Sequence, residues 1–147
     1  MTSLDVIYKA FLNKVKDDDW DDASQLVSYE KTWKEYLLSA INLFKFPRVD
    51  LTYNEQGEYL EGDLSNNEIQ ILAEYMRAEW LQGNISTWEN IKEQYHEADF
   101  SQANFLDKLD KTYKTALAAA RRRESNYYRS IGGQPFNYSD LAGDDNG

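Results

Sequence analysis

Apolar side chains recur every three or four residues at the start of the chain, which is the spacing of one helical face. These positions are Leu4, Ile7, Tyr8, Phe11, Leu12 and Val15. The spacing predicts an amphipathic helix over residues 3–16, with Ser3 able to cap it. The same spacing returns further on and predicts a second helix from about Ala23 or Ser28 to Phe44, before Pro47.

Strict alternation of apolar and polar residues replaces the helical spacing after Pro47. Val49, Leu51 and Tyr53 alternate with polar neighbours, and residues 54–57 have the composition of a turn. We therefore expect a β-hairpin around residues 48–64. Two short strands are marginally stable alone, so this hairpin needs helices beneath it or a strand of another chain beside it.

Ser65 and Glu68 have the spacing of a capping box that opens a third helix. This helix is apolar on nearly all sides, which is typical of a central helix. Its apolar residues are Ile69, Ile71, Leu72, Ala73, Tyr75, Met76, Ala78 and Trp80. We expect Trp80 to be buried in the core and Gly83 to end the helix.

Two further helices are expected after Gly83. The capping-box spacing recurs at Ser86 and Glu89 and predicts a short fourth helix that ends near residue 97. A long fifth helix follows, and its apolar stripe thins after Ala120 although the helix continues to Gly132. The whole pattern predicts a mainly α fold of about five helices with one short β-hairpin.

The chain of 147 residues, of which 14% are aromatic, is expected to form one domain with a real core. We expect a helical domain with a hairpin insertion over residues 1–131. Residues 132–147 show no periodicity and are expected to form a flexible C-terminal tail.

Charge and composition exclude several classes of protein. Residues 1–100 carry 9 basic and 20 acidic side chains, whereas residues 101–147 carry 7 and 6. An acidic body argues against general nucleic-acid binding, which needs a basic surface for the phosphates. The chain has no cysteine, and no segment approaches the apolar length of a membrane span.

Sequence motifs give no support for catalysis, because no nucleophile elbow or phosphate-binding glycine loop occurs. His96 forms an E-x-x-H pair with Glu93, but a carboxylate metal site needs a second such pair. Asp17, Asp19 and Asp21 alternate as in a calcium loop, yet positions 22 and 28 lack the required Gly and Glu. We expect no enzyme activity, no cofactor and no metal.

The end of the chain combines arginines with aromatic residues and is the candidate partner-binding segment. Arg and Tyr are enriched at interface hot spots, and we expect residues 121–142 to contribute little to the fold of the subunit. The alternatives are a solvated cationic run at a helix C-terminus and contact with nucleic acid. The candidate residues are Arg121, Arg122, Arg123, Tyr127, Tyr128, Arg129, Phe136 and Tyr138.

The order of these segments resembles small virion proteins encoded among the head and tail genes of tailed bacteriophages. The segments that carry the likeness are AINLFKFPRVDL, EIQILAEYMRAEWL, NIKEQYHEADFSQANFL and PFNYSDLAG. Over about residues 1–142 the chain is similar to head–tail connectors, also called adaptor, neck or head-completion proteins. No functional residue carries over by motif.

The resemblance implies a structural subunit of a ring of about twelve copies beneath the portal, with DNA passing through the centre. The implied partners are copies of the chain, the portal protein and an adjacent neck or tail protein, with DNA only as non-specific channel content. The chain would be made in the bacterial host cytoplasm and end in the virion, without membrane contact. The alternatives are a tail-completion protein, a tail-assembly chaperone, or a DNA-binding regulator that uses residues 121–129.

Overall fold

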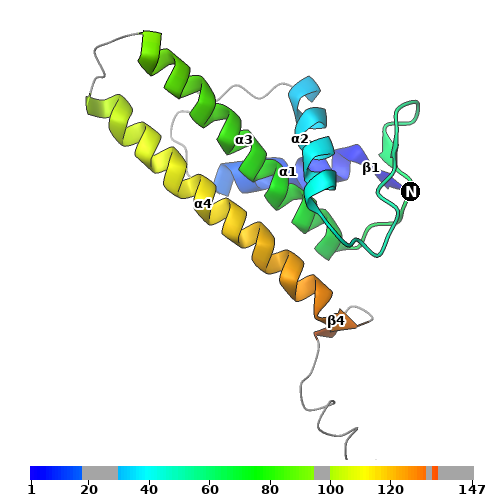
Figure 1. The fold of residues 1–147 in the computed structure, drawn as a ribbon. Coiled ribbons are helices and arrows are strands. Elements are labelled where there is room, and N and C mark those ends of the chain that lie inside the picture. The colour runs from blue at the N-terminus through cyan, green and yellow to red at the C-terminus, as the bar shows by residue number, and fades with distance from the viewer. Residues whose placement is uncertain (18–29, 95–99, 132–133, 136–147) are drawn as a thin grey trace, which may run out of the picture.

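The computed structural model describes residues 1–17, 30–94, 100–131 and 134–135. Within these ranges the fold is mainly helical, as expected. Its helices are α1 (Leu4–Asp17), α2 (Glu30–Leu43), α3 (Asn66–Gln94) and α4 (Phe100–Tyr128). The two long helices, α3 and α4, lie side by side, and α1 and α2 pack against α3 (Figure 1).

Helix α3 is the centre of the fold, as its apolar pattern predicts. Every residue from Ile71 to Met76 is buried, so no side of this stretch faces solvent. Trp80 is 1% exposed, and its ring meets that of Phe11 edge-on with 6.4 Å between centroids. The expected burial of Trp80 is therefore confirmed.

The expected break at Gly83 is wrong, because α3 continues through it as one helix of 29 residues. Glycine costs about 1 kcal/mol relative to alanine inside a helix, and packing on both sides of Gly83 outweighs this cost. Leu81 and Asn84 are buried, and the Asn84 side-chain amide donates to the Trp80 carbonyl at 2.9 Å. The expected third and fourth helices are thus a single helix in the described part of the chain.

The expected hairpin is present and is completed by the N-terminus of the same chain. Strands β2 (Tyr53–Asn54) and β3 (Tyr59–Leu60) form the hairpin, and β1 (Thr2–Ser3) pairs with β3 on its other side, all antiparallel. The Thr2 hydroxyl donates to the Gly62 carbonyl at 2.8 Å and accepts from the Leu64 amide at 2.9 Å. A third strand therefore supplies the support that a lone hairpin lacks.

Several sequence-based expectations lie outside the described residues. These are most of the acidic run that contains Asp19 and Asp21, the lone His96, and the tail with Phe136 and Tyr138. Within the described ranges, no helix combines the length and the apolar character that crossing a bilayer requires. Strands β4 (Ser130–Ile131) and β5 (Gln134–Pro135) pair antiparallel after α4.

Candidate functional site

The C-terminal part of α4 packs against the rest of the subunit, so the expectation that it leaves the core after Ala120 is wrong. Tyr127 is 4% exposed and belongs to the hydrophobic core. Its hydroxyl donates to Glu68 Oε2 at 2.8 Å and accepts from the Arg48 backbone amide at 2.8 Å. The apolar stripe thins here because polar partners replace aliphatic contacts.

Arg48 fastens the end of α4 to the segment that follows α2. Its guanidinium donates to the Tyr127 carbonyl at 2.8 Å and to the Ser130 carbonyl at 2.5 Å. The same group lies 4.5 Å from the centroid of the Tyr127 ring. A cation at a helix C-terminus satisfies carbonyls that lack partners within the helix and complements the helix dipole.

Glu68 links these contacts between Arg48 and Tyr127 to the start of α3. The Ser65 amide donates to Glu68 Oε1 at 2.8 Å, and the Glu68 amide donates to Ser65 Oγ at 3.3 Å. The expected capping box is therefore present, and its carboxylate also receives the Tyr127 hydroxyl. Burial raises the pKa of Tyr127, and its bond to Glu68 acts in the same direction.

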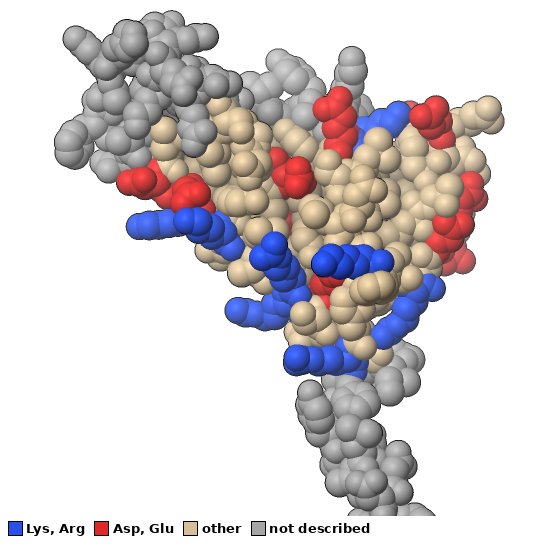
Figure 2. Space-filling model, in the orientation of Figure 1, with Lys and Arg blue, Asp and Glu red and all other residues tan. Residues whose placement is uncertain are grey.

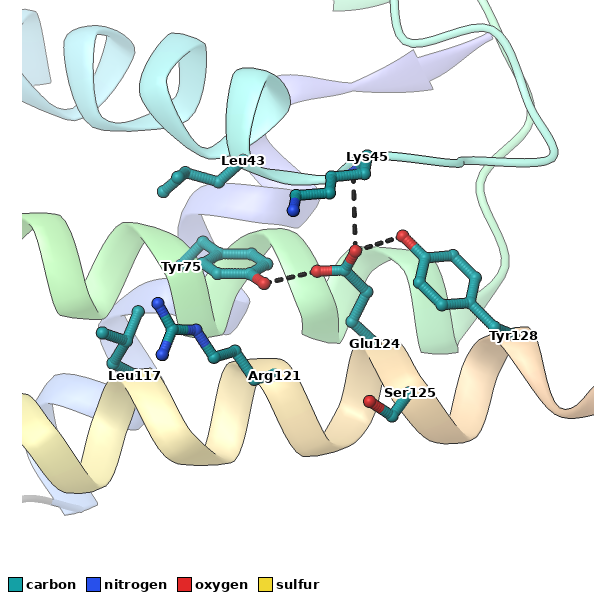
Figure 3. Close-up of a pocket in the computed structure, with 8 residues that line it drawn as sticks. All are labelled: Leu43, Lys45, Tyr75, Leu117, Arg121, Glu124, Ser125 and Tyr128. Carbon is teal, nitrogen blue, oxygen red and sulfur yellow. Dashed lines mark hydrogen bonds between the residues drawn. The ribbon is translucent and has the colours of Figure 1, made fainter.

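A second buried carboxylate, Glu124 on α4, forms the floor of a pocket of about 350 Å³ (Figure 3). The Tyr75 hydroxyl donates to Glu124 Oε1, and the Tyr128 hydroxyl donates to Oε2. The Lys45 backbone amide also donates to Oε2, at 3.4 Å. Pocket residues come from α2, α3, α4 and the segment after α2: Leu43, Lys45, Tyr75, Leu117, Arg121, Glu124, Ser125 and Tyr128.

Burial and the hydrogen bonds in the pocket raise the pKa values of its tyrosines, which favours the neutral form. Burial raises the pKa of Tyr75, and the hydrogen bond to Glu124 adds to this shift. Burial and the same carboxylate raise the pKa of Tyr128 to about 12. Because its two oxygens accept hydrogen bonds from Tyr75, Tyr128 and the Lys45 amide, the Glu124 carboxylate joins α3, α4 and the segment after α2.

A third buried acid, Glu74 on α3, is surrounded by cations. Lys14 of α1 and Arg77 of α3 lie 3.1 Å from its carboxylate oxygens, and Arg123 of α4 lies at 3.5 Å. A buried charge needs such partners to offset its lost hydration. Arg123, one of the candidate partner-binding residues, therefore also joins α4 to the core.

The remaining candidate arginines, on α4 and directly after it, are exposed. Arg121, Arg122 and Arg129 make no ion pair with any residue that the structure describes. Lys45 is also exposed. It lies near Arg121, because both residues line the same pocket. We call Lys45, Arg121, Arg122 and Arg129 the basic face. Figure 2 shows Lys and Arg side chains gathered along the lower side of the molecule, where α4 ends.

An exposed aromatic ring lies beside the basic face. Phe46 is 71% exposed, and its ring centroid lies 5.8 Å from that of Tyr128. The Phe46 amide donates to the Tyr128 hydroxyl at 3.1 Å, which fixes the segment that carries the ring. Tyr128, a candidate from the sequence, is 37% exposed and therefore remains available at the surface.

Sequence reasoning found the arginines and Tyr128 but missed Lys45, Phe46 and Arg48. These residues lie about 80 positions before the end of α4, and no periodic signal joins the two segments. Two further candidates, Phe136 and Tyr138, lie outside the described residues. In the described ranges, no three or more side chains of metal-binding type lie together.

Comparison with known proteins identifies the origin of the chain. A family model described as YomZ prophage protein matches residues 1–127. The chain belongs to this family. The match contains α1, α2, α3 and all but the last residue of α4. No curated protein and no solved structure matches the chain significantly. The expected phage origin of this prophage protein is therefore confirmed.

Proposed function

We propose that the chain is a structural phage protein, a ring subunit of the neck that connects the capsid portal to the tail. Membership of a prophage family supports a phage role. The observation that carries the finer proposal is the separation of exposed charge into unlike faces. A closed ring needs two different, complementary surfaces on each subunit, because every copy meets its neighbours head to tail.

The acidic face lies on and beside the hairpin. Residues 50–63 contain no Lys or Arg, and all five of their acids are exposed. The basic face lies on the lower side of the molecule in Figure 2, at the C-terminal end of α4 and on the segment after α2. Its partners in this role would be copies of the chain, the portal protein and an adjacent neck or tail protein.

Net charge is consistent with a channel through which DNA passes. The chain carries a formal charge of -10, and acidic walls repel phosphates and prevent tight non-specific binding. DNA would therefore be a transient content of the ring. The protein would act in the virion neck, after its synthesis in the bacterial host.

Deleting the gene from an inducible prophage tests this role. Electron microscopy of the particles should show heads and tails that are not joined, because the connecting ring is missing. Restoring the gene in trans should restore joined particles. Joined particles at the parental frequency after deletion would contradict the neck assignment.

A DNA-binding regulator is the second candidate, and it is favoured by the exposed cations Arg121, Arg122 and Arg129, which form no ion pair with a described residue. Such binding depends steeply on salt, since each phosphate contact releases a counterion. A titration of duplex DNA at several salt concentrations separates the two roles. Tight binding that weakens steeply with salt supports the regulator, and absence of binding supports the connector.

A further inference from the structure

We propose that the acidic hairpin of one copy of this chain docks on the basic face of the next copy. The acidic hairpin is defined by five exposed acids: Asp50, Glu55, Glu58, Glu61 and Asp63. The proposal rests on the ring function proposed above and names the surfaces that meet in the ring.

The charges of the two surfaces are opposite in sign and similar in number, with five acids on the hairpin and four cations on the basic face. The acidic hairpin contains no cation in its sequence range, and the basic face holds four exposed cations. Figure 2 shows acidic side chains on the right of the molecule and basic ones along its lower side. Because the surfaces lie on different sides, a second copy can place its hairpin on the basic face of the first.

Aromatic side chains accompany the charges on both surfaces. Phe46 is 71% exposed and borders the basic face through its contact with Tyr128. Tyr53 and Tyr59 of the hairpin are partly exposed. Exposed ion pairs alone contribute little to affinity, so apolar contacts of this kind are needed to hold the orientation.

The hairpin is held firmly enough to act as a docking element. β1 pairs with its second strand, and the N-terminal amine pairs with Asp63. The Gly62 amide donates to the Asp50 carbonyl at 2.8 Å, which closes the base of the hairpin. A β-carbon at Gly62 would lie 2.4 Å from the Asp50 carbonyl oxygen, so only glycine permits this closure.

The two acids nearest the turn are best suited to mutation. Asp50 accepts hydrogen bonds from Thr52, Asp63 pairs with the N-terminus, and Glu61 accepts from Asn54. The side chains of Glu55 and Glu58 make no bond to any described residue. Their replacement therefore changes the charge of the hairpin without removing a contact that supports it.

The experiment uses two complementary charge-reversal variants of the full chain. The hairpin variant carries Glu55→Lys and Glu58→Lys, and the face variant carries Arg121→Glu and Arg129→Glu. Sedimentation velocity at low salt is measured for each variant alone, for their equimolar mixture and for the parental protein. Glu35→Lys and Lys111→Glu, at exposed positions outside both surfaces, are the matched controls.

We expect weak, salt-sensitive association of the parental protein and of both controls. Each charge-reversed variant alone should have a dissociation constant for self-association that is at least about tenfold higher than that of the parental protein. The mixture should recover association, because the parental hairpin of the face variant meets the parental face of the hairpin variant, and the two reversed surfaces carry opposite introduced charges. Circular dichroism melts of the variants, expected to match the parental melt, show that the subunits remain folded.

Three outcomes would overturn the docking proposal: a parental protein that stays monomeric at every concentration, reversed variants that associate like the parent, or a mixture that does not associate. A face variant that loses DNA binding while keeping self-association would assign the basic face to nucleic acid instead. Mass spectrometry of induced particles separates this failure from failure of the neck role. Variants present in particles at parental levels contradict the docking contact alone, whereas absence of the parental protein contradicts the neck role.

Discussion

Replacing Tyr127 with Phe tests the hydrogen bonds that hold the end of α4 against the rest of the subunit. The change keeps the buried ring and removes only the hydroxyl, which donates to Glu68 and accepts from the Arg48 amide. A hydrogen bond to a charged group contributes roughly 1.5–3 kcal/mol, and a neutral one roughly 0.5–1.5. Glu68 is 3% exposed, so water replaces the lost donor poorly. We expect the free energy of unfolding to fall by about 2–4 kcal/mol.

Urea unfolding followed by circular dichroism measures this change. In a chain of this size the melting temperature should fall by about 6–12 °C. Tyr113→Phe is the matched control, because Tyr113 lies on the same helix and its hydroxyl makes no hydrogen bond with a described residue. Glu68→Gln should cost less in the Tyr127→Phe background than in the parent, since the shared bond is already lost.

The reasoning would be refuted by a loss below about 0.5 kcal/mol for Tyr127→Phe, within the range of an ordinary surface change. An equal loss for Tyr113→Phe would also refute it. Either result would mean that the end of α4 is not fastened through this hydroxyl.

Four further predictions concern the core, the hairpin, the tyrosines and the tail. Trp80→Ala should lower the free energy of unfolding, measured in urea, by about 3–5 kcal/mol. Trp80→Phe should lower it by only about 1–2 kcal/mol, because the indole N–H that is lost has no acceptor among the described residues. Glu58→Gly should stabilise the subunit by about 1 kcal/mol, since Glu58 has a φ of 53°; a lower unfolding midpoint would contradict this. Because the pKa of Tyr128 is raised to about 12 and unfolded Tyr titrates near 10, stability should fall as pH rises from about 10 to 12. Urea midpoints should fall less steeply with pH in Tyr128→Phe. Truncation after Ser130 should leave the melting temperature within about 3 °C and reduce incorporation into particles; an unfolded product would contradict it.

Local patterns predicted the helices and much of the core. The spacing of apolar residues identified α1 and the central position of α3, and the Ser65–Glu68 spacing identified its capping box. These features depend on residues within one or two turns of each other. Their signal is therefore contained in a short stretch of sequence.

Features that depend on distant segments could not be predicted in this way. Thr2 and Ser3 form a strand only because the hairpin offers an edge to pair with, and two residues show no alternation. Arg48 contacts the end of α4 some 80 residues further on, and the sequence placed this residue only at the start of the predicted hairpin. Gly83 has a strong local signal to end a helix, but packing of its neighbours outweighed it.

The candidate surface was predicted in part. Exposed arginines on α4 were found from the sequence because three of them are consecutive. The sequence did not indicate that Arg123 pairs with the buried Glu74 or that Tyr127 is buried. Both depend on the packing of α4 against α3, which no local pattern encodes.

Quantitative mass spectrometry of particles purified after prophage induction tests the neck assignment most directly. Peptides of this chain should be present in a fixed ratio to the portal protein, close to one copy for each portal subunit if the ring matches the portal. The chain should also be retained in particles washed at high salt. Its absence from purified particles, with abundant protein in the cell lysate, would contradict the account.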